Sequence, residues 1–155
     1  MIFDLAQAVA SGHLAPIDDI ESAKLCRKFA EQGKAWAQFH LGFMYACGKG
    51  VVQSEAEAVK WHRKAAEQGH ARAQFFLGLM LGRGRGAARN DAEAARWFRK
   101  AADQGNASAQ YMLGRSYFYG CGLEQDKFEA EFWLIESARQ GNKKAVEFLR
   151  NLLDD

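Results

Sequence analysis

The chain has 155 residues, of which 26% are charged, and its formal net charge is +2. This length suits one domain of about 100 to 200 residues, and the near balance of charge gives no strong field favouring nucleic acid or an anionic membrane. The longest apolar run, residues 75–81, is far shorter than the ~20 residues of a membrane-spanning helix, so no transmembrane span is expected.

The first residues, MIFDLAQAVASGHLAP, contain an acid at Asp4 and no basic region, so they do not resemble a secretory signal. The odd number and irregular spacing of Cys26, Cys47 and Cys121 favour reduced thiols over a disulfide framework. We therefore expect a cytoplasmic protein, or a periplasmic or secreted one if an upstream signal segment was removed.

Residues 1–33 predict an atypical first unit, with helices over 2–11 and 19–32. Asp18 is followed three residues later by Glu21, a capping-box pattern that indicates the start of the second helix. Leu25 stands where later units have tryptophan. We expect this unit to form a polar cap.

Three more regular units follow, over 34–69, 70–105 and 106–141, and they repeat with a period of 36 residues. A period of this length indicates supersecondary units that bury their apolar faces against their neighbours. The recurring positions are Trp61, Trp97 and Trp133, the Leu-Gly pairs at 41–42, 77–78 and 113–114, and the segments FAEQG, AAEQG, AADQG and SARQG.

Each unit begins with a predicted amphipathic helix, helix A, over 35–47, 71–83 and 107–119. In the first of these, Gln38, Leu41, Gly42 and Tyr45 follow the i, i+3, i+4, i+7 spacing of one helix face. Gly42 has no side chain, which lets two helix backbones approach closely. Its counterparts are Gly78 and Gly114, and the recurrent aromatic residues interpreted as core are Phe39, Phe75 and Tyr111.

A GxG turn leads from helix A to helix B, which we predict over 55–68, 91–104 and 127–140. Ser54, Asn90 and Asp126 each precede a glutamate by three residues, a pattern that satisfies backbone N–H groups at a helix start. Each helix B ends near a glycine of the recurring QG pair, which suits a left-handed residue after a helix. Residues 142–155 predict a C-terminal capping helix, with a helical pattern over 143–153.

The segment GRGRGAARN at 82–90 fits the loose form of a dinucleotide-binding fingerprint and contains two Arg-Gly steps. However, the other units have GKG at 48–50 and GCG at 120–122 in the same phase, so these glycines indicate a turn. No strand precedes Gly82, and specific nucleotide or RNA binding is therefore disfavoured. The middle unit also has a basic bias that suits an anchor for an acidic partner segment, at Arg72, Arg83, Arg85, Arg89, Arg96 and Arg99. For Arg96 and Arg99 we instead expect a solvated face paired with Asp91, Glu93 and Asp103, whereas the loop arginines lack such close partners.

The recurring pattern is A-x-A-Q-[FY]-x-L-G-x-x-Y, then G-x-G, then A-x-x-W-x-x-K-A-A-x-x-G, and with it the chain resembles the Sel1-like repeat family. The middle unit carries it at Ala71, Ala73, Gln74, Phe75, Leu77, Gly78, Gly84, Gly86, Ala94, Trp97, Lys100, Ala101, Ala102 and Gly105. Tetratricopeptide repeats are the nearest alternative, but their period is 34 and they usually carry a proline. The resemblance implies an all-α fold, a right-handed α/α superhelix (solenoid) of about four two-helix units. It also implies a scaffold for protein complexes, often in bacterial signalling, host interaction or stress pathways.

Beside its packed face, helix A carries a stripe at i, i+4, i+7 and i+11 whose residues differ between units. Aromatic residues, Met and Arg are enriched in interface cores and hot spots, so this stripe is the candidate partner-binding site. Trp36 is the most informative member, because it is the only tryptophan outside the recurrent phase. The candidate residues are Trp36, His40, Phe43, Arg72, Phe76, Leu79, Arg83, Met112, Arg115 and Tyr119, and the stripe also holds Cys47 and Ser108.

No catalytic residue, metal site or cofactor is predicted. The four histidines, His13, His40, His62 and His70, occupy unrelated phases of the repeat, so no pair has the i, i+4 spacing that zinc prefers. His40 and Cys47 share the stripe, but no carboxylate or second thiol is placed beside them. The glutamates that recur at the helix B starts are interpreted as capping groups, and no acid–base pair can be assigned.

The function expected from these patterns is a non-enzymatic scaffold or adaptor that binds another protein or a peptide segment in a concave helix A groove. One alternative is a stoichiometric inhibitor or immunity-type partner of a cognate protein. The other is a receptor for a small ligand or anion, centred on Arg72, Arg83 and Arg115. We expect no nucleic acid partner and no membrane span, and a monomer or weak homodimer.

Overall fold

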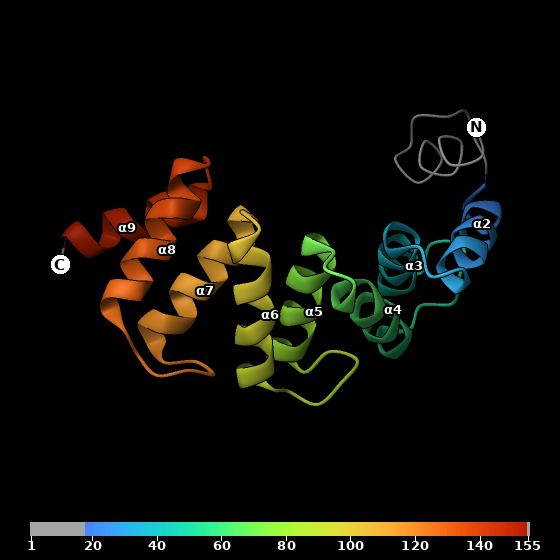
Figure 1. Cartoon of the computed structure of the whole chain (residues 1–155), viewed down its shortest axis with the longest axis horizontal. Coiled ribbons are helices and arrows are strands. Elements are labelled where there is room, and N and C mark those ends of the chain that lie inside the picture. Colours follow the sequence, from blue (N-terminus) through green and yellow to red (C-terminus); the bar gives the residue numbers. More distant parts are fainter. Residues whose placement is uncertain (1–17, 155) are drawn as a thin grey trace. The chain divides into compact units, whose positions relative to one another are not determined.

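The structure is a computed structural model that describes residues 18–154, and this part of the chain is all-α (Figure 1). The expected helix over 2–11 lies outside the described residues. In chain order the helices are α2 (Asp19–Glu31), α3 (Ala35–Cys47), α4 (Glu55–Glu67), α5 (Ala71–Arg83), α6 (Asp91–Asp103), α7 (Ala107–Tyr119), α8 (Lys127–Arg139) and α9 (Lys143–Asp154).

The chain divides into two compact units, Met1–His70 and Ala71–Asp155, which are described separately. In the first unit α3 packs against both α2 and α4. In the second unit each helix from α5 to α9 packs against the next, and Figure 1 shows α6 between α5 and α7. This sequential packing is the arrangement expected when each two-helix repeat buries its apolar face against its neighbours.

The helix bounds agree closely with the spacing of caps and glycines in the sequence. α3, α5 and α7 have the bounds predicted for helix A, and each helix B ends one residue earlier than predicted. Side chains of the predicted N-caps accept hydrogen bonds from the expected backbone N–H groups. The pairs are Asp18 with Glu21 (2.8 Å), Ser54 with Glu57 (3.2 Å), Asn90 with Glu93 (2.9 Å) and Asp126 with Glu129 (3.1 Å).

The glutamine of the recurring QG pair joins the two helices of a repeat. Gln68 Nε2 donates to Gln38 Oε1 at 2.7 Å and to the Gly33 carbonyl at 2.9 Å. Gln140 Nε2 makes the corresponding bond to Gln110 Oε1 at 2.8 Å, and Gln104 Nε2 bonds to Gln74 Oε1 at 2.8 Å. The acceptor glutamines are buried, so each amide pair satisfies polar atoms that would otherwise be costly to desolvate.

The Leu-Gly glycines mark points of close helix approach, as predicted. A Cβ atom on Gly78 would lie 2.6 Å from Cε1 of Phe98, and one on Gly42 would lie 2.8 Å from Nδ1 of His62. On Gly114 it would lie 2.8 Å from Cγ of Leu134. Since van der Waals contact needs more than 3.4 Å, the absence of a side chain is what allows helix A to lie this close to helix B.

Gly78 and Gly82 lie in the same helix, so alanine substitutions at the two positions test the effect of this close approach. We expect Gly78→Ala to lower the free energy of unfolding by about 1–2 kcal/mol, because overlap with the buried Phe98 ring outweighs the better helix propensity of alanine. Gly82→Ala should instead raise it by about 0.5–1 kcal/mol, because its Cβ would meet only Ala94 Cβ, at an ordinary 3.6 Å. Urea unfolding followed by circular dichroism measures both. Equal effects of the two substitutions would contradict the close-approach explanation.

The second glycine of the GxG turn contacts the start of the preceding helix B. Gly122 has a φ of 77°, and a Cβ on it would lie 2.0 Å from the carbonyl oxygen of Asp91, the first residue of α6. Gly50, with a φ of 68°, makes the same approach to Asp19, the first residue of α2, at 1.9 Å. The second glycine of these two turns is therefore required both by backbone conformation and by contact between repeats.

Arginine side chains of helix B bridge to the next repeat. In the second unit Arg99 hydrogen-bonds the Tyr117 hydroxyl, lies 5.4 Å from the centre of the Trp133 ring and forms a 3.7 Å ion pair with Glu129. In the first unit Arg27 bonds the Tyr45 hydroxyl in the same way. Arg99 thus has acidic and aromatic partners on the following repeat rather than the nearby acids expected from the sequence.

Candidate partner-binding face

A cleft in the second unit lies between α5, α7 and the start of α9, and we call it the α5–α7–α9 cleft. Its volume is about 470 Å³. It contains the stripe residues Leu79, Arg83, Ser108 and Met112, which the structure thus brings together from two helix A elements. The remaining lining residues are Phe75, Ala107, Tyr111, Gln140, Gly141, Asn142, Lys143 and Lys144.

The floor of this cleft is apolar and half-buried. It consists of Leu79 from α5 and Met112 from α7, with Phe75 and Tyr111, and all four residues are half-buried. Phe75 and Tyr111 were interpreted from the sequence as core residues, and for these two that interpretation is wrong. Phe39 in the same phase is buried, with 3% of its surface exposed, whereas Phe75 and Tyr111 are half-buried and remain accessible from the cleft.

The rim of the cleft is basic. Arg83 comes from the end of α5, and Lys143 and Lys144 come from the first turn of α9. No aspartate or glutamate lines the cleft, and the sequences of α5 and α7 contain no carboxylate at all. The Asn142 side chain accepts hydrogen bonds from the backbone N–H groups of Lys144 and Ala145 and thereby caps α9. These two N–H groups are therefore already bonded, and the positive charge in the cleft comes from the Arg83, Lys143 and Lys144 side chains.

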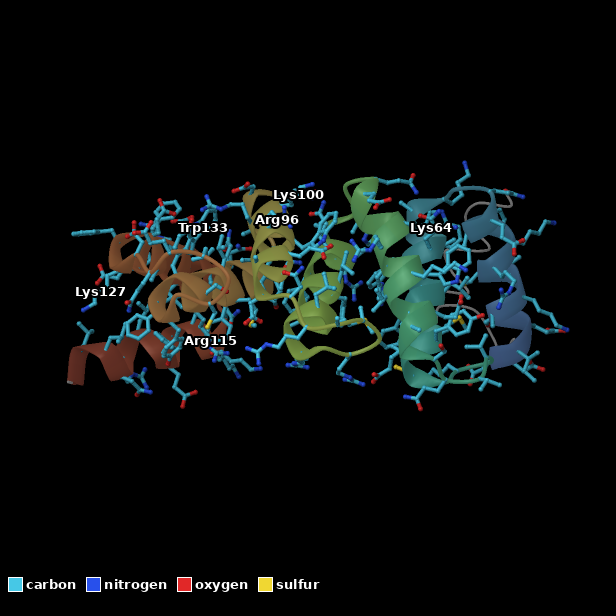
Figure 2. All side chains as sticks on the ribbon, turned by 90° about the horizontal axis from the view of Figure 1, so that it is seen from below. Lys64, Arg96, Lys100, Arg115, Lys127 and Trp133 are labelled. Carbon is cyan, nitrogen blue, oxygen red and sulfur yellow. The ribbon has the colours of Figure 1, made fainter. Side chains whose placement is uncertain are left out.

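Arg115 lies in an aromatic cluster next to the cleft. Its guanidinium is 5.6 Å from the ring centre of Tyr111 and 5.9 Å from that of Tyr119. Phe148 of α9 lies against the Tyr111 and Tyr119 rings, at centroid distances of 6.4 and 6.2 Å. Figure 2 shows Arg115 on the side of the unit where α9 lies, with Arg96, Lys100 and Trp133 on the opposite side. The second unit thus has a helix A face with its own aromatic and basic residues.

The other predicted residues of the second unit also lie on its surface. Arg72 is exposed near the start of α5, and Phe76 is half-buried with its ring 5.4 Å from that of Phe75. Tyr119, at the end of α7, is 56% exposed. These positions are accessible to a partner but do not line the cleft itself.

In the first unit, Trp36, His40 and Phe43 lie along α3. Trp36 is half-buried and packs on the core beside Phe29, at a ring distance of 5.6 Å, so part of its surface stabilises the fold. His40 is half-buried against the rings of Trp36 and Phe39. Phe43 is 40% exposed. Of the three, Phe43 presents the most accessible apolar surface to a partner.

Sequence reasoning missed α9 as a source of site residues. Lys144 and Phe148 stand 36 residues after Ser108 and Met112, so they continue the stripe into the capping helix. These two positions could have been predicted, because the 36-residue spacing that defines the stripe continues into α9. Lys143 had no such signal, since its position in the cleft depends on how α9 packs.

The structure of the arginine–glycine loop contradicts one expectation from the sequence. Arg89 was expected to lack a close partner, but its guanidinium donates two hydrogen bonds to the Asp91 carboxylate, at 3.0 and 2.9 Å. The hydrogen bonds from Arg89 hold the pKa of Asp91 below its usual value. A smaller cleft of about 170 Å³ lies here and shares Leu79, Arg83 and Met112 with the α5–α7–α9 cleft.

An exposed apolar row on α8 was also missed. Phe128 and Phe132 are 87% and 54% exposed, and Ile135 is 43% exposed. The corresponding residues one unit earlier are Ala92, Arg96 and Arg99. The exposed side of α8 thus carries an apolar row beside its charged residues Lys127, Glu131 and Arg139.

Within residues 18–154 no three metal-ligating side chains are grouped closely enough to hold a metal ion. Burial, together with a smaller effect of neighbouring His70, lowers the pKa of His62 from 6.5 to about 4. Burial raises the pKa of the Cys26 thiol to about 11, while Cys47 and Cys121 are exposed. The helices of this part of the chain are also too short or too polar for any of them to span a bilayer.

Comparison with known proteins places the chain among repeat proteins. The family model for the Sel1 repeat matches residues 2–34, 37–70, 71–106 and 107–142. A protective antigen of uropathogenic Escherichia coli strains, described as displaying an SLR fold, is 38% identical over 93% of this chain, with a TM-score of 0.86. A Sel1 repeat protein from Oxalobacter formigenes is 36% identical over 95% of this chain, also with a TM-score of 0.86.

This chain spans 31% of the first of these proteins and 60% of the second. Helicobacter pylori cysteine rich protein B is 19% identical, with a TM-score of 0.65 over 84% of this chain and 94% of its own, and shares the fold alone. No curated protein matches the chain.

Proposed function

Because the chain belongs to the Sel1 repeat family, whose repeats typically mediate protein interactions, we propose that it is a non-enzymatic protein-binding scaffold. The partner docks on the helix A face. In the first unit this face comprises the outer side chains of α3, and in the second unit those of α5 and α7. The proposed anchors are Phe43, Leu79, Arg83, Met112, Arg115 and Tyr119.

The observation that carries this proposal is the composition of the helix A face. It exposes or half-exposes aromatic side chains on α3, α5 and α7, with methionine on α3 and α7 and arginine on α5 and α7, and the sequences of these three helices contain no carboxylate. Helix B of the second and third repeats instead carries mixed charges on its outer side, which is typical of a solvated surface. Aromatic residues and arginine are the types that dominate interface energetics.

A receptor for a small anion is the second candidate, and the basic rim of the α5–α7–α9 cleft favours it. Its volume falls in the range of ~300–1,000 Å³ that small-ligand pockets occupy. The two candidates differ in footprint, because a protein interface covers roughly 800 Å² on each partner and needs more of the helix A face than this cleft. Variants outside the cleft therefore distinguish them.

Affinity capture from native lysate, read by mass spectrometry, tests the proposal with three folded variants. Phe43→Ser with Tyr119→Ser removes helix A anchors outside the cleft, Lys60→Glu with Arg96→Glu alters the outer helix B face, and Phe128→Ser with Phe132→Ser removes the α8 row. We expect only the first variant to reduce capture, by about 10-fold, the scale of one or two hot-spot side chains. Circular dichroism and melting temperature confirm that each is folded.

Loss of the partner with the α8 variant alone would place the interface on α8 and refute the helix A proposal. Undiminished capture by all three variants would do the same. A protein without any captured partner, but with an anion bound in the cleft, would favour the receptor function.

A further inference from the structure

The α5–α7–α9 cleft has a chemistry that narrows the class of partner. We propose that it binds an acidic segment of the partner protein that inserts one large apolar side chain between α5 and α7. This inference rests on the proposed function, since it names the part of a protein partner that the second unit recognises.

The apolar component follows from the floor of the cleft. Leu79 and Met112 approach it from two helices, and the Phe75 and Tyr111 rings stand beside them. A methionine is flexible and polarisable, and it adapts to aromatic or branched side chains of different shape. Burial of one such side chain removes apolar surface from water on both sides, which is the main favourable term of peptide docking.

The preference for acidic residues in the segment follows from cations that have no carboxylate partner within the described residues. The cations near the cleft, Arg83, Arg115, Lys143 and Lys144, form no ion pair within the described residues, and Arg115 lies beside the Tyr111 and Tyr119 rings. By contrast, several cations elsewhere have carboxylate partners: Lys60 with Glu57, Arg89 with Asp91, Arg99 with Glu129 and Arg139 with Glu136. Carboxylates of a partner protein would form ion pairs with these cations.

The positions of these cations favour an extended segment over a compact anion. Arg83 lies at the end of α5, and Lys143 and Lys144 lie at the start of α9, so they line the cleft from different helices while the apolar floor is formed by α5 and α7. A segment with an apolar residue flanked by acids satisfies both features at once. A phosphate or a free carboxylate would leave Leu79 and Met112 exposed to water.

The internal amides of the cleft contribute little to recognition, because they are already bonded. Gln140 Nε2 donates to Gln110 Oε1 and to the Gly105 carbonyl, at 2.8 and 2.9 Å. The Asn142 side chain caps α9 and also donates to the Ala107 carbonyl. Selectivity therefore comes from the side-chain cations and from the shape of the apolar floor.

Fluorescence anisotropy with three labelled peptides tests the inference on the full chain. The probe DEDLFDED carries both features, NQNLFNQN lacks the acids, and DEDSSDED lacks the apolar pair. We expect the probe to bind at least about 10-fold more tightly than either control peptide, and its affinity to fall as salt rises from about 0.15 to 0.5 M, because exposed charges are screened.

Two variants with the same change in net charge provide the matched comparison. Arg83→Glu with Lys144→Glu should weaken binding of DEDLFDED by about 10-fold or more. Arg96→Glu with Lys127→Glu, on α6 and α8, should leave it within about twofold, because neither residue lines the cleft. Circular dichroism checks that each variant is folded.

Equal binding of DEDLFDED and NQNLFNQN, or equal loss with both charge variants, would overturn the acidic-segment inference. If no peptide binds but the helix A variant still loses its captured partner, the inference is wrong and the proposed function stands. If that capture also fails to depend on helix A, both are wrong. Tighter binding of DEDSSDED than of the probe would overturn the insertion of an apolar side chain.

Discussion

Replacing Gly122 by alanine is expected to lower the free energy of unfolding by about 3 kcal/mol. Its φ of 77° is a left-handed conformation that costs roughly 1–2 kcal/mol in any residue with a Cβ. The added Cβ would also lie 2.0 Å from the carbonyl oxygen of Asp91, a backbone atom at the start of α6 that cannot move without shifting the helix. Overpacking of this kind typically adds another 1–3 kcal/mol.

Gly105→Ala is the matched control, because Gly105 has a similar φ of 89° and no atom within 4 Å of the added Cβ. It should cost only the conformational part, about 1 kcal/mol. Chemical unfolding of both variants, followed by far-ultraviolet circular dichroism, measures the difference. If the two substitutions cost the same, the contact between the GxG turn and the preceding helix B contributes nothing to stability.

Acidification from pH 6.5 to 4 should remove about 3 kcal/mol of stability through His62 alone. Burial holds its pKa at about 4 in the folded protein, against 6.5 when exposed to water. Above pH 6.5 both states carry a neutral imidazole, so His62 makes no contribution to the pH dependence. Between pH 6.5 and 4 only the unfolded chain binds the proton, and the free energy of unfolding falls by about 1.4 kcal/mol per pH unit. Below pH 4 the loss is complete.

His62→Phe tests this effect with a residue that the fold already uses at this position. Phe98 stands 36 residues later and packs against Gly78 as His62 packs against Gly42. Urea unfolding at several pH values should show a flatter pH dependence for the variant between pH 6.5 and 4. Carboxylates titrate in both proteins, so the difference between the two curves isolates His62. Parallel curves would show that His62 is not buried in its neutral form.

The helices of this chain are predictable from sequence because their determinants are local and repeated. Ser54, Asn90 and Asp126 each satisfy backbone donors within three residues, and the recurring glycines adopt positive φ after each helix B. The same local logic identified Gly78 as a point of close approach. Because the pattern occurs in four copies, an atypical residue in one copy does not change the predicted helices.

The candidate site was less predictable because it depends on packing between different helices. The stripe on α5 and α7 located Leu79, Arg83 and Met112, which do share a cleft. Sequence spacing did not show that Phe75 and Tyr111 would remain accessible. In a solenoid the same phase is covered or open according to how the next repeat packs against it. The prediction of the stripe as a binding site stays a prediction until variants are measured.

The bridges from Arg27 to Tyr45 and from Arg99 to Tyr117 imply that repeats are not interchangeable parts. Ile135 and Leu153 occupy the same two phases in the last pair, so neither side chain there can form this hydrogen bond. A deletion of residues 106–141 would bring Leu153 into the phase of Tyr117, so Arg99 would lose the hydroxyl that accepts its hydrogen bond. Because the bridge joins helix B of one repeat to helix A of the next, loss of a whole repeat changes the partner of the arginine even where the helix pattern is kept.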